Sequence, residues 1–310
     1  MNIKKPRFWR KKNNFLSLLL FPIAILIQLL NIIKNKFSSN QSFNIPVICV
    51  GNIFIGGTGK TPLTIMITKE LIEKGKKPAI IRKFYSDHLD EHRLIKNNVN
   101  CLFLNKKRNI AIKDAEKAKY DVAILDDGFQ DHSIKKNLNI LCFNSNQQIG
   151  NGQVLPAGPL RETLSSLRSA NIIMINGEKN IEFELKLKKY NSNLKFFYFN
   201  YNLKKFDEFK NRKLIAFAGI GNSINFFNTL KNNRLNVIRE ISFPDHYDFT
   251  DKDLERLGIM EDQNKAKLIT TEKDYLRINQ IFRKKYNSIH IDVVLENDDL
   301  FKKEINKFLK

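Results

Sequence analysis

The stretch that most constrains the fold of this chain runs from residue 45 to residue 62 and reads IPVICVGNIFIGGTGKTP. Its beginning is almost wholly apolar, which predicts a short buried strand. A glycine-rich turn follows, and Lys60 and Thr61 then open an apolar-periodic segment that predicts a helix. Strand, glycine loop, Lys-Thr and helix in this order are typical of a phosphate-binding loop. We therefore expect a nucleotide-binding α/β domain.

Each residue type in this loop suits the binding of phosphate. Glycine lets backbone N–H groups turn inward around an anion at a helix N-terminus. Lys60 is expected to reach the terminal phosphates of a nucleotide, and the Thr61 hydroxyl to ligate Mg²⁺. The strict pattern has a further glycine where this chain has Phe54. The residues expected to hold the nucleotide are Gly56, Gly57, Thr58, Gly59, Lys60 and Thr61.

A second apolar run ends in two acidic residues. Val122 to Leu125 predicts a buried parallel strand, and Asp126 and Asp127 follow it directly. Ligands of open α/β sheets bind at the carboxyl ends of the strands, and a strand-end aspartate is the expected Mg²⁺ partner of a phosphate loop. The alternative interpretation is a charged pair that caps a helix.

Strand-like and helix-like segments alternate along the chain, which predicts an α/β protein with mainly parallel sheets. The pattern restarts near Lys204 with KLIAFAGIGN, a strand that runs into a glycine turn. The 310 residues suffice for two such domains. We expect an N-terminal segment over residues 1–40, a P-loop domain over 41–203, and a second α/β/α domain over 204–310 that closes a cleft over the first.

The formal net charge of +21 is compatible with a nucleic-acid partner or with an anionic membrane. The lysines are spread along the chain, and no recognition module or aromatic stacking platform accompanies them, so we expect no nucleic-acid partner. An anionic membrane surface or an anionic lipid substrate accounts for the charge as well. The cysteines and histidines are unclustered in sequence, which argues against a zinc site or a disulfide framework and indicates a reducing compartment.

The N-terminus begins with the basic segment MNIKKPRFWRKK and continues without charge from Asn13 to Ile33, which is long enough to span a bilayer. We favour a helix that lies in the membrane interface, with the basic residues on anionic lipid heads. A spanning helix opposes the positive-inside bias, and a signal peptide lacks its cleavage site. A further alternative is a helix that packs on the protein's own core. The polar residues that share an arc of about 100° on a helical wheel are Asn13, Asn14, Ser17, Gln28 and Asn31.

Together the motifs resemble those of one family, tetraacyldisaccharide 4′-kinase (the lipid A 4′-kinase). The similar stretches, in the family's order, are VGNIFIGGTGKTP, LDDGFQDH, NGQVLPAGPLRE, AFAGIGN, FPDHYDFT and ITTEKD. The resemblance implies ATP- and Mg²⁺-dependent phosphorylation of the 4′-hydroxyl of a tetraacylated glucosamine disaccharide 1-phosphate in lipid A biosynthesis. It implies a peripheral or monotopic protein at the cytoplasmic face of the inner membrane, and no obligate protein partner is evident.

The resemblance also implies roles for single residues. The acidic residues that match those around the family's metal are Asp126, Asp127 and Glu162, beside Thr61. Gln130 and Arg161 match polar residues of the family's active site, with Gln130 expected at the nucleotide and Arg161 in catalysis.

The base of the reaction is implied in the same way. Asp90 matches the aspartate that the family is thought to use as base, and His246 matches the histidine that supports it. Because these two residues lie in different halves of the chain, we expect domain closure to complete the pair. This chain departs from the family in having Leu89 and His92 beside Asp90 and Glu91, and taken alone the segment SDHLDEHRLI is typical of a solvated loop.

The rival hypothesis is a membrane-surface P-loop ATPase that acts as a partner-binding switch. The loop of that class normally begins with a lysine, and this chain has Ile55 in its place. A GTPase is disfavoured because the guanine-binding motif N-K-x-D is absent. Dependence of ATP turnover on the lipid disaccharide, on a protein partner or on DNA separates these classes.

Overall fold

The structure is a computed structural model that describes residues 6–36, 39–204 and 206–309. The chain folds into two compact units. The larger unit contains residues 6–85, 99–200 and 294–309, and the smaller unit contains residues 86–98 and 201–293. Two segments therefore fall differently from the expected domains, because residues 86–98 pack with the C-terminal half and residues 294–309 pack with the N-terminal half.

A parallel sheet forms the centre of the larger unit, in the strand order β3-β2-β4-β1-β5-β6-β7. Its strands are β1 (Val47–Gly51), β2 (Pro78–Lys83), β3 (Leu102–Asn105), β4 (Val122–Asp126), β5 (Leu138–Asn144), β6 (Ile172–Asn176) and β7 (Lys195–Lys204). Strand β1 lies between β4 and β5, with Val50 beside Asp126. Consecutive buried residues in β1 and β4 show that both faces of the sheet are covered, as in doubly wound folds.

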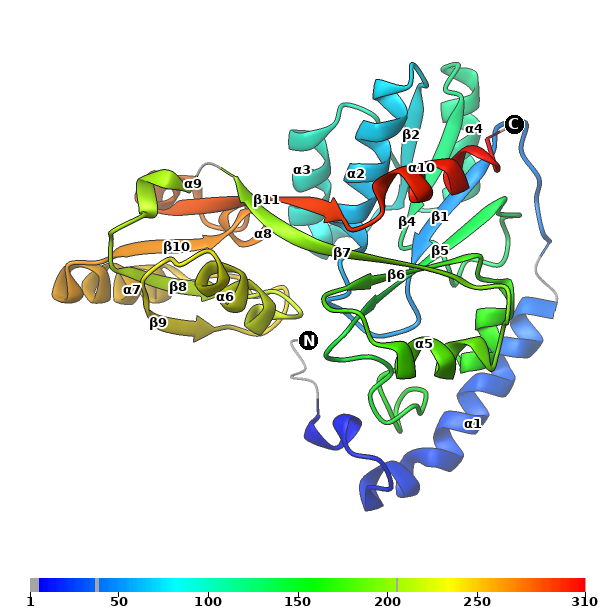
Figure 1. The fold of residues 1–310 in the computed structure, drawn as a ribbon, viewed down its shortest axis with the longest axis horizontal. Coiled ribbons are helices and arrows are strands. Elements are labelled where there is room, and N and C mark those ends of the chain that lie inside the picture. The colour runs from blue at the N-terminus through cyan, green and yellow to red at the C-terminus, as the bar shows by residue number, and fades with distance from the viewer. Residues whose placement is uncertain (1–5, 37–38, 205, 310) are drawn as a thin grey trace. The chain divides into compact units, whose positions relative to one another are not determined.

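Helices cover this sheet on both faces (Figure 1). The helices of this unit are α1 (Phe15–Lys36), α2 (Lys60–Glu73), α4 (Arg108–Lys117), α5 (Ile181–Lys188) and α10 (Asp298–Asn306), with the short helices η1 (Arg7–Arg10) and η3 (Leu164–Ser169). Helix α2 contacts β1, β2 and β4. The core on the other face joins Ile112 of α4 and Phe183 of α5 to Leu125 of β4. The short η3 follows Arg161 and Glu162 directly after Thr163.

Helix α1 docks on the larger unit along one stripe. Ser17 and Ala24 are buried and Gln28 is partly buried. Asn151 Nδ2 donates to Ser17 Oγ over 3.0 Å, and Gln28 Nε2 donates to the Arg161 carbonyl oxygen over 3.3 Å. The polar arc that the sequence predicts is thus partly used for docking on the protein itself.

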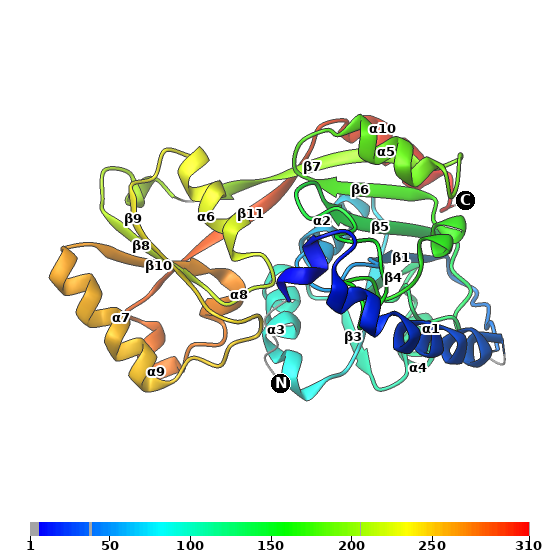
Figure 2. The ribbon, with the colours of Figure 1, turned by 90° about the horizontal axis from the view of Figure 1, so that it is seen from below.

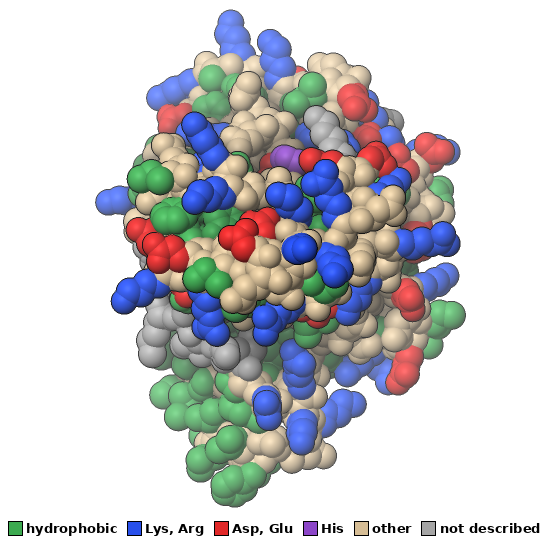
Figure 3. Space-filling model, turned by 90° about the vertical axis from the view of Figure 1, so that its left-hand side faces the viewer, with side chains coloured by type: hydrophobic (Ala, Val, Ile, Leu, Met, Phe, Trp, Pro, Cys, Tyr) green, Lys and Arg blue, Asp and Glu red, His purple; other side chains and the backbone are tan. Residues whose placement is uncertain are grey.

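The other faces of α1 are apolar and exposed. Phe15 is 76% and Leu18 is 71% exposed, and the segment Phe15–Ile33 is long and apolar enough to cross a membrane. Figure 3 shows hydrophobic side chains gathered at the lower end of the molecule, where Figure 1 places α1, with Lys and Arg side chains beside them. Lys4 and Lys5 of the basic segment lie outside the described residues. The exposed apolar surface of α1 is far larger than its docked stripe.

In the smaller unit, β8 pairs in parallel with both β9 and β10, and β10 pairs in parallel with β11. Its strands are β8 (Leu214–Ala218), β9 (Val237–Ser242), β10 (Lys267–Thr271) and β11 (Asn287–Leu295). Alternate residues of β8 face opposite sides: Ala216 packs with Phe227, and Phe217 packs with Leu254. Figure 2 shows α6 (Ser223–Asn232) on one side and α7 (Asp251–Asn264) on the other.

The segment SDHLDEHRLI is part of the smaller unit and is not a solvated loop. It forms η2 (Ser86–His88) and the start of α3 (Leu89–Asn98), and Asp90 is buried. Helix α3 packs on α8 (Glu272–Tyr275), where Arg93 Nη1 donates to the Leu276 carbonyl oxygen over 3.2 Å. The loop interpretation was wrong because the buried carboxylate is compensated by cationic side chains that lie far away in sequence. The remaining short helices of the described residues are η4 (Asp207–Phe209) and α9 (Gln280–Arg283).

Candidate functional site

The glycine-rich loop adopts the conformation of an anion cradle. Gly56, Gly57 and Gly59 have φ values of 70°, 62° and 90°, in the left-handed region that glycine adopts without strain. Gly59 directly precedes α2, so the loop delivers its backbone to a helix N-terminus. Asn52 Nδ2 donates to Thr58 Oγ1 over 2.8 Å and braces the loop from inside. The geometry suits the binding of phosphate at the start of α2.

The Gly/Pro-rich segment before Glu162 is hydrogen-bonded to this loop through the backbone. Ile55 N donates to the Pro159 carbonyl oxygen over 2.9 Å, and Arg161 N donates to the Ile53 carbonyl oxygen over 2.7 Å. These bonds bring Arg161 to the phosphate loop, where its Nη1 lies 3.4 Å from Gln130 Oε1. Two residues that the sequence predicts for one site, Gln130 and Arg161, are therefore in contact.

Asp126, at the end of β4, faces the start of α2. Thr61 Oγ1 donates to its Oδ2 over 3.1 Å, and Thr64 Oγ1 donates to its Oδ1 over 3.3 Å. The Arg82 guanidinium forms a buried ion pair with the same carboxylate. A hydroxyl and a strand-end carboxylate in contact are oxygen ligands of the kind that Mg²⁺ takes beside a phosphate loop. Thr61 and Asp126 therefore fit a magnesium ion.

Two cationic side chains, Lys60 and Arg161, lie beside Asp127, the residue that follows Asp126. The φ of Asp127, 56°, is left-handed, an uncommon conformation for a residue other than glycine. Lys60 Nζ lies 3.7 Å from its Oδ1, and Arg161 Nη1 donates to the same oxygen over 2.9 Å. Burial opposes the ionisation of Asp127, but Lys60 and Arg161 outweigh it and hold the pKa of the carboxyl well below its usual range. Burial lowers the pKa of Lys60.

Two further contacts at this site were not predicted. Arg108 Nη2 donates to the Asp127 carbonyl oxygen over 2.7 Å, although Arg108 belongs to no motif. Glu162, expected near the metal, pairs with His132, whose Nε2 lies 3.3 Å from Glu162 Oε1. The adjacency of His132 to the LDDGFQ stretch is a signal in the sequence, whereas Arg108 carries none.

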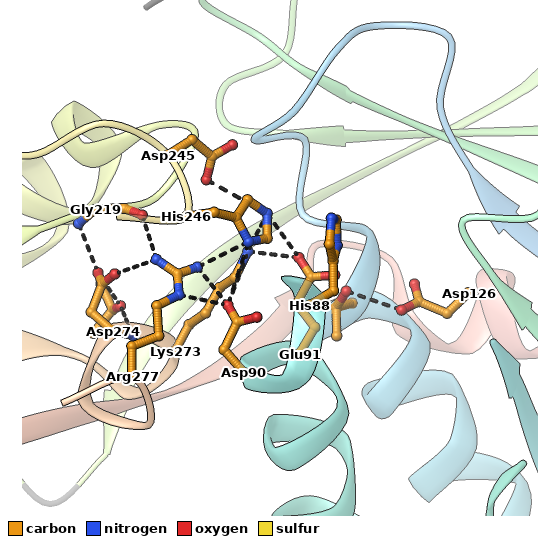
Figure 4. Close-up of polar contacts among 12 residues, drawn as sticks. His88, Asp90, Glu91, Asp126, Gly219, Asp245, His246, Lys273, Asp274 and Arg277 are labelled. Atoms are coloured by element: carbon orange, nitrogen blue, oxygen red, sulfur yellow. Dashed lines mark hydrogen bonds and ion pairs between the residues drawn. The ribbon is translucent and has the colours of Figure 1, made fainter. Parts of the chain in front are cut away.

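A second polar cluster lies in the smaller unit (Figure 4). His246 Nδ1 lies 3.7 Å from Asp90 Oδ2, so the two residues expected to form the base are neighbours. Both belong to the smaller unit, and their association therefore does not require the domain closure that we expected. Arg277 binds the same Asp90 oxygen through Nε at 2.9 Å and Nη2 at 2.5 Å. Arg277 thus anchors α3 to the segment that follows α8.

His246 is held in an unusual conformation. Its φ is 57°, and its backbone N–H donates to the Gly219 carbonyl oxygen over 3.0 Å. Its Nε2 lies 3.3 Å from Lys273 Nζ. Burial and the positive charge of Lys273 lower the pKa of His246 to about 4. The imidazole is therefore neutral at physiological pH.

Lys273 connects the two acidic residues of α3. Its Nζ lies 2.6 Å from Glu91 Oε1 and 3.7 Å from Asp90 Oδ2. Burial opposes the ionisation of Asp90, but Lys273 and Arg277 lower the pKa of its carboxyl overall. Neither Lys273 nor Arg277 is among the predicted site residues. The available signal was the position of TTEKDYLR at the carboxyl end of β10, where ligands bind in such folds.

Comparison with known proteins yields one consistent family. The profile of the family described as tetraacyldisaccharide-1-P 4′-kinase matches residues 16–310. A tetraacyldisaccharide 4′-kinase of Pelagibacter ubique is 43% identical over 286 residues, covering 91% of this chain and 90% of the relative. That of Rickettsia bellii is 32% identical, covering 88% and 89%. The crystal structure of LpxK from Aquifex aeolicus in complex with ATP is similar with a TM-score of 0.72 at 25% identity, covering 96% of this chain and all of the other.

Proposed function

We infer the reaction from one premise: the chain belongs to the tetraacyldisaccharide-1-P 4′-kinase family. The protein is a kinase of lipid A biosynthesis that acts on a tetraacylated disaccharide 1-phosphate. We propose that ATP is the phosphoryl donor, that Mg²⁺ is the cofactor, and that the acceptor is the 4′-hydroxyl of the glucosamine disaccharide. The ATP bound in the similar Aquifex aeolicus structure supports the choice of donor.

The observation that carries the nucleotide site is the pairing of Thr61 with Asp126 and of Lys60 with Asp127 at the start of α2. Phosphoryl transfer depends on positioning and on neutralising charge, with little covalent chemistry for the protein. Lys60 and Arg161 supply positive charge to the transferred phosphoryl group, and the cradle of glycines binds the other phosphates. Thr61 and Asp126 would hold Mg²⁺, which would supply neutralising charge to the phosphate oxygens. Asp127 keeps Lys60 and Arg161 in place.

The acceptor hydroxyl must lose a proton as the new bond forms. We assign this proton to the unit of Asp90 and His246. Asp90 is ionised at neutral pH because Lys273 and Arg277 lower its pKa, and His246 is neutral there. A carboxylate beside a neutral imidazole has the capacity to accept a proton from a sugar hydroxyl. Arg277 acts only through Asp90, as a positioning residue.

Helix α1 supports the proposed membrane location. Its exposed apolar faces suit the acyl region of a bilayer, and Arg7, Arg10, Lys11 and Lys12 precede it. We propose that α1 lies in the interface of the inner membrane on its cytoplasmic side, where the acyl chains of the substrate remain in lipid. The stripe of Ser17, Ala24 and Gln28 packs on the larger unit while the other faces of the helix contact lipid.

The test is ATP consumption by the purified full chain in mixed micelles, with and without tetraacyldisaccharide 1-phosphate. We expect turnover to depend on the lipid and to yield a product with a new phosphate on the 4′ position. Lys60→Ala should lose at least about 100-fold in kcat, since it removes a charge that stabilises the transition state. Lys76→Ala, an exposed lysine after α2, is the matched control. Turnover that is indifferent to the lipid would favour the switch ATPase.

A further inference from the structure

Three potential metal ligands converge in the smaller unit (Figure 4). His88 ends η2, Glu91 lies in the first turn of α3, and His246 lies in the loop after β9. Their ligand atoms all lie within 4.8 Å of one another. We propose that His88, Glu91 and His246 form a binding site for a divalent transition-metal ion of the Zn²⁺ class. This site shares no residue with the proposed magnesium site and has a different ligand chemistry.

The spacing of the donor atoms supports this assignment. Glu91 lies between the two rings, with Oε2 at 3.5 Å from His88 Nδ1 and Oε1 at 3.7 Å from His246 Nε2. Zinc bonds of about 2.0–2.1 Å place neighbouring ligands of a tetrahedral ion about 3.4 Å apart. Small side-chain movements therefore bring the carboxylate and both imidazoles onto one ion. The ring centroids of His88 and His246 are 4.5 Å apart, so neither ring has far to move.

A cationic side chain already lies among the three ligands. The ammonium group of Lys273 lies 2.6 Å from Glu91 Oε1 and 3.3 Å from His246 Nε2, so both ligands face a position that a metal ion would share with it. Asp245 Oδ1 lies 3.9 Å from His246 Nε2, and within the described part of the chain this buried oxygen accepts no hydrogen bond. A bound ion takes the place of Lys273 beside Glu91, and the ammonium turns to Asp90, 3.7 Å away.

The ligand set selects the kind of ion. Two imidazoles and one carboxylate suit Zn²⁺, Ni²⁺ and Co²⁺, whereas Mg²⁺ prefers a site made only of oxygen. If the proposed function is right, an ion on His246 withdraws this ring from the catalytic pair and inhibits phosphoryl transfer.

The test measures metal binding directly, so it does not depend on kinase activity. The full chain without an affinity tag is dialysed against Zn²⁺ in the presence of saturating Mg²⁺, and the visible absorption of bound Co²⁺ reports imidazole ligation. We expect the wild type to bind one Zn²⁺ more tightly than His88→Ala does, by at least about tenfold, because changes around a metal site typically cost that much or more. Glu91→Gln, which keeps the size of the side chain, should weaken binding similarly.

His290→Ala is the matched control, because His290 is a half-exposed histidine of the same unit that pairs with Glu272. Equal binding by the wild type and His88→Ala, or an equal loss in His290→Ala, would overturn the proposal. In the kinase assay, Zn²⁺ should inhibit the wild type at concentrations at least about tenfold below those needed for His88→Ala. An absence of lipid-dependent turnover would refute the proposed function and leave the binding result standing.

Discussion

Arg277 and Asp90 form a forked ion pair in which two guanidinium nitrogens donate to one carboxylate oxygen, over 2.9 and 2.5 Å. Both side chains are almost completely buried. Arg277 also donates to the Gly219 carbonyl oxygen and to Asp274, so it links α3 to two other segments of the smaller unit. Desolvated charges of this kind are tolerated only in pairs, and removing one partner is costly.

We therefore expect Arg277→Met to destabilise the smaller unit by about 3–5 kcal/mol at neutral pH. The depressed pKa of Asp90 contributes stability that is present above the ordinary pKa of this carboxyl and is lost as the pH falls through its lowered value. The difference between wild type and Arg277→Met should thus shrink below about pH 4. Urea denaturation at several pH values measures it, with Arg277→Lys as a control that keeps the charge. A difference that is unchanged on acidification would contradict the assignment.

The proposed base should behave as a unit. We expect Asp90→Ala, His246→Ala and the double variant to lose similar activity, each by about 10²–10⁴-fold in kcat, because either change disables the same proton transfer. Steady-state kinetics on lipid substrate in mixed micelles measures the three losses, with His290→Ala as the control. Losses that multiply in the double variant would show that the two residues act independently.

The pKa of His246 should respond to Lys273. The charged groups that face this ring are Lys273, Arg277, Asp90, Glu91 and Asp245, with His88 stacked beside it. Lys273→Met removes one cation and should raise the pKa of His246 from about 4 toward, but not up to, its ordinary value of 6.5, since burial and Arg277 remain. The acid limb of the kcat/KM profile should move to higher pH accordingly, and NMR titration of the ring reports the same shift.

The lowered pKa of His246 also determines how the stability of the protein depends on pH. Because the folded protein disfavours protonated His246, the wild type should lose stability as the pH falls from about 6.5 to about 4, where the unfolded chain takes up the proton. Lys273→Met should reduce the part of this loss that belongs to His246. An unchanged titration of His246 in the variant would refute the role of Lys273.

Thr61 and Thr64 both donate to the Asp126 carboxylate, but only Thr61 is a proposed magnesium ligand. Thr61→Ala should raise the Mg²⁺ concentration needed for half-maximal turnover on the order of tenfold, because it removes a ligand oxygen. Thr61→Ser keeps the hydroxyl and should restore the wild-type requirement. Thr64→Val removes the buried hydrogen bond to Asp126 Oδ1 and should lower stability without changing the Mg²⁺ requirement. Equal Mg²⁺ curves for Thr61→Ala and the wild type would exclude Thr61 as a ligand.

The exposed faces of α1 should determine membrane binding. Leu18, Leu26 and Ile33 are all more than half exposed, and their joint replacement by glutamate should weaken binding to anionic vesicles at least about 100-fold, since each buried leucine-sized side chain contributes about 1.5–3 kcal/mol. Vesicle sedimentation measures the change, and ATP binding should persist. The control is Ile259→Glu on α7, a comparably exposed apolar residue. Unchanged sedimentation of the triple variant would rule out α1 as the anchor.

The sequence by itself placed Lys60, Thr61 and Asp126 in the proposed phosphate site of the larger unit. Lys60 and Thr61 follow the glycines directly, so local backbone geometry places them at the start of α2. Asp126 ends an apolar strand, and the parallel register of β4 with β1 brings that strand end to the loop. These three residues are predictable because short-range sequence and the rules of parallel sheets position them.

Only the tertiary structure decided the cluster of the smaller unit. Asp90 and Glu91 look like solvated residues in sequence. The burial of Asp90 and the partial burial of Glu91 depend on Lys273 and Arg277, which approach because α3 packs on α8. Such long-range compensation of charge leaves no periodic pattern in the chain. For the same reason His88 and His246, which are far apart in sequence, both lie close to Glu91 in the structure. Local patterns encode which elements form, whereas the packing of distant elements decides which charges lie together.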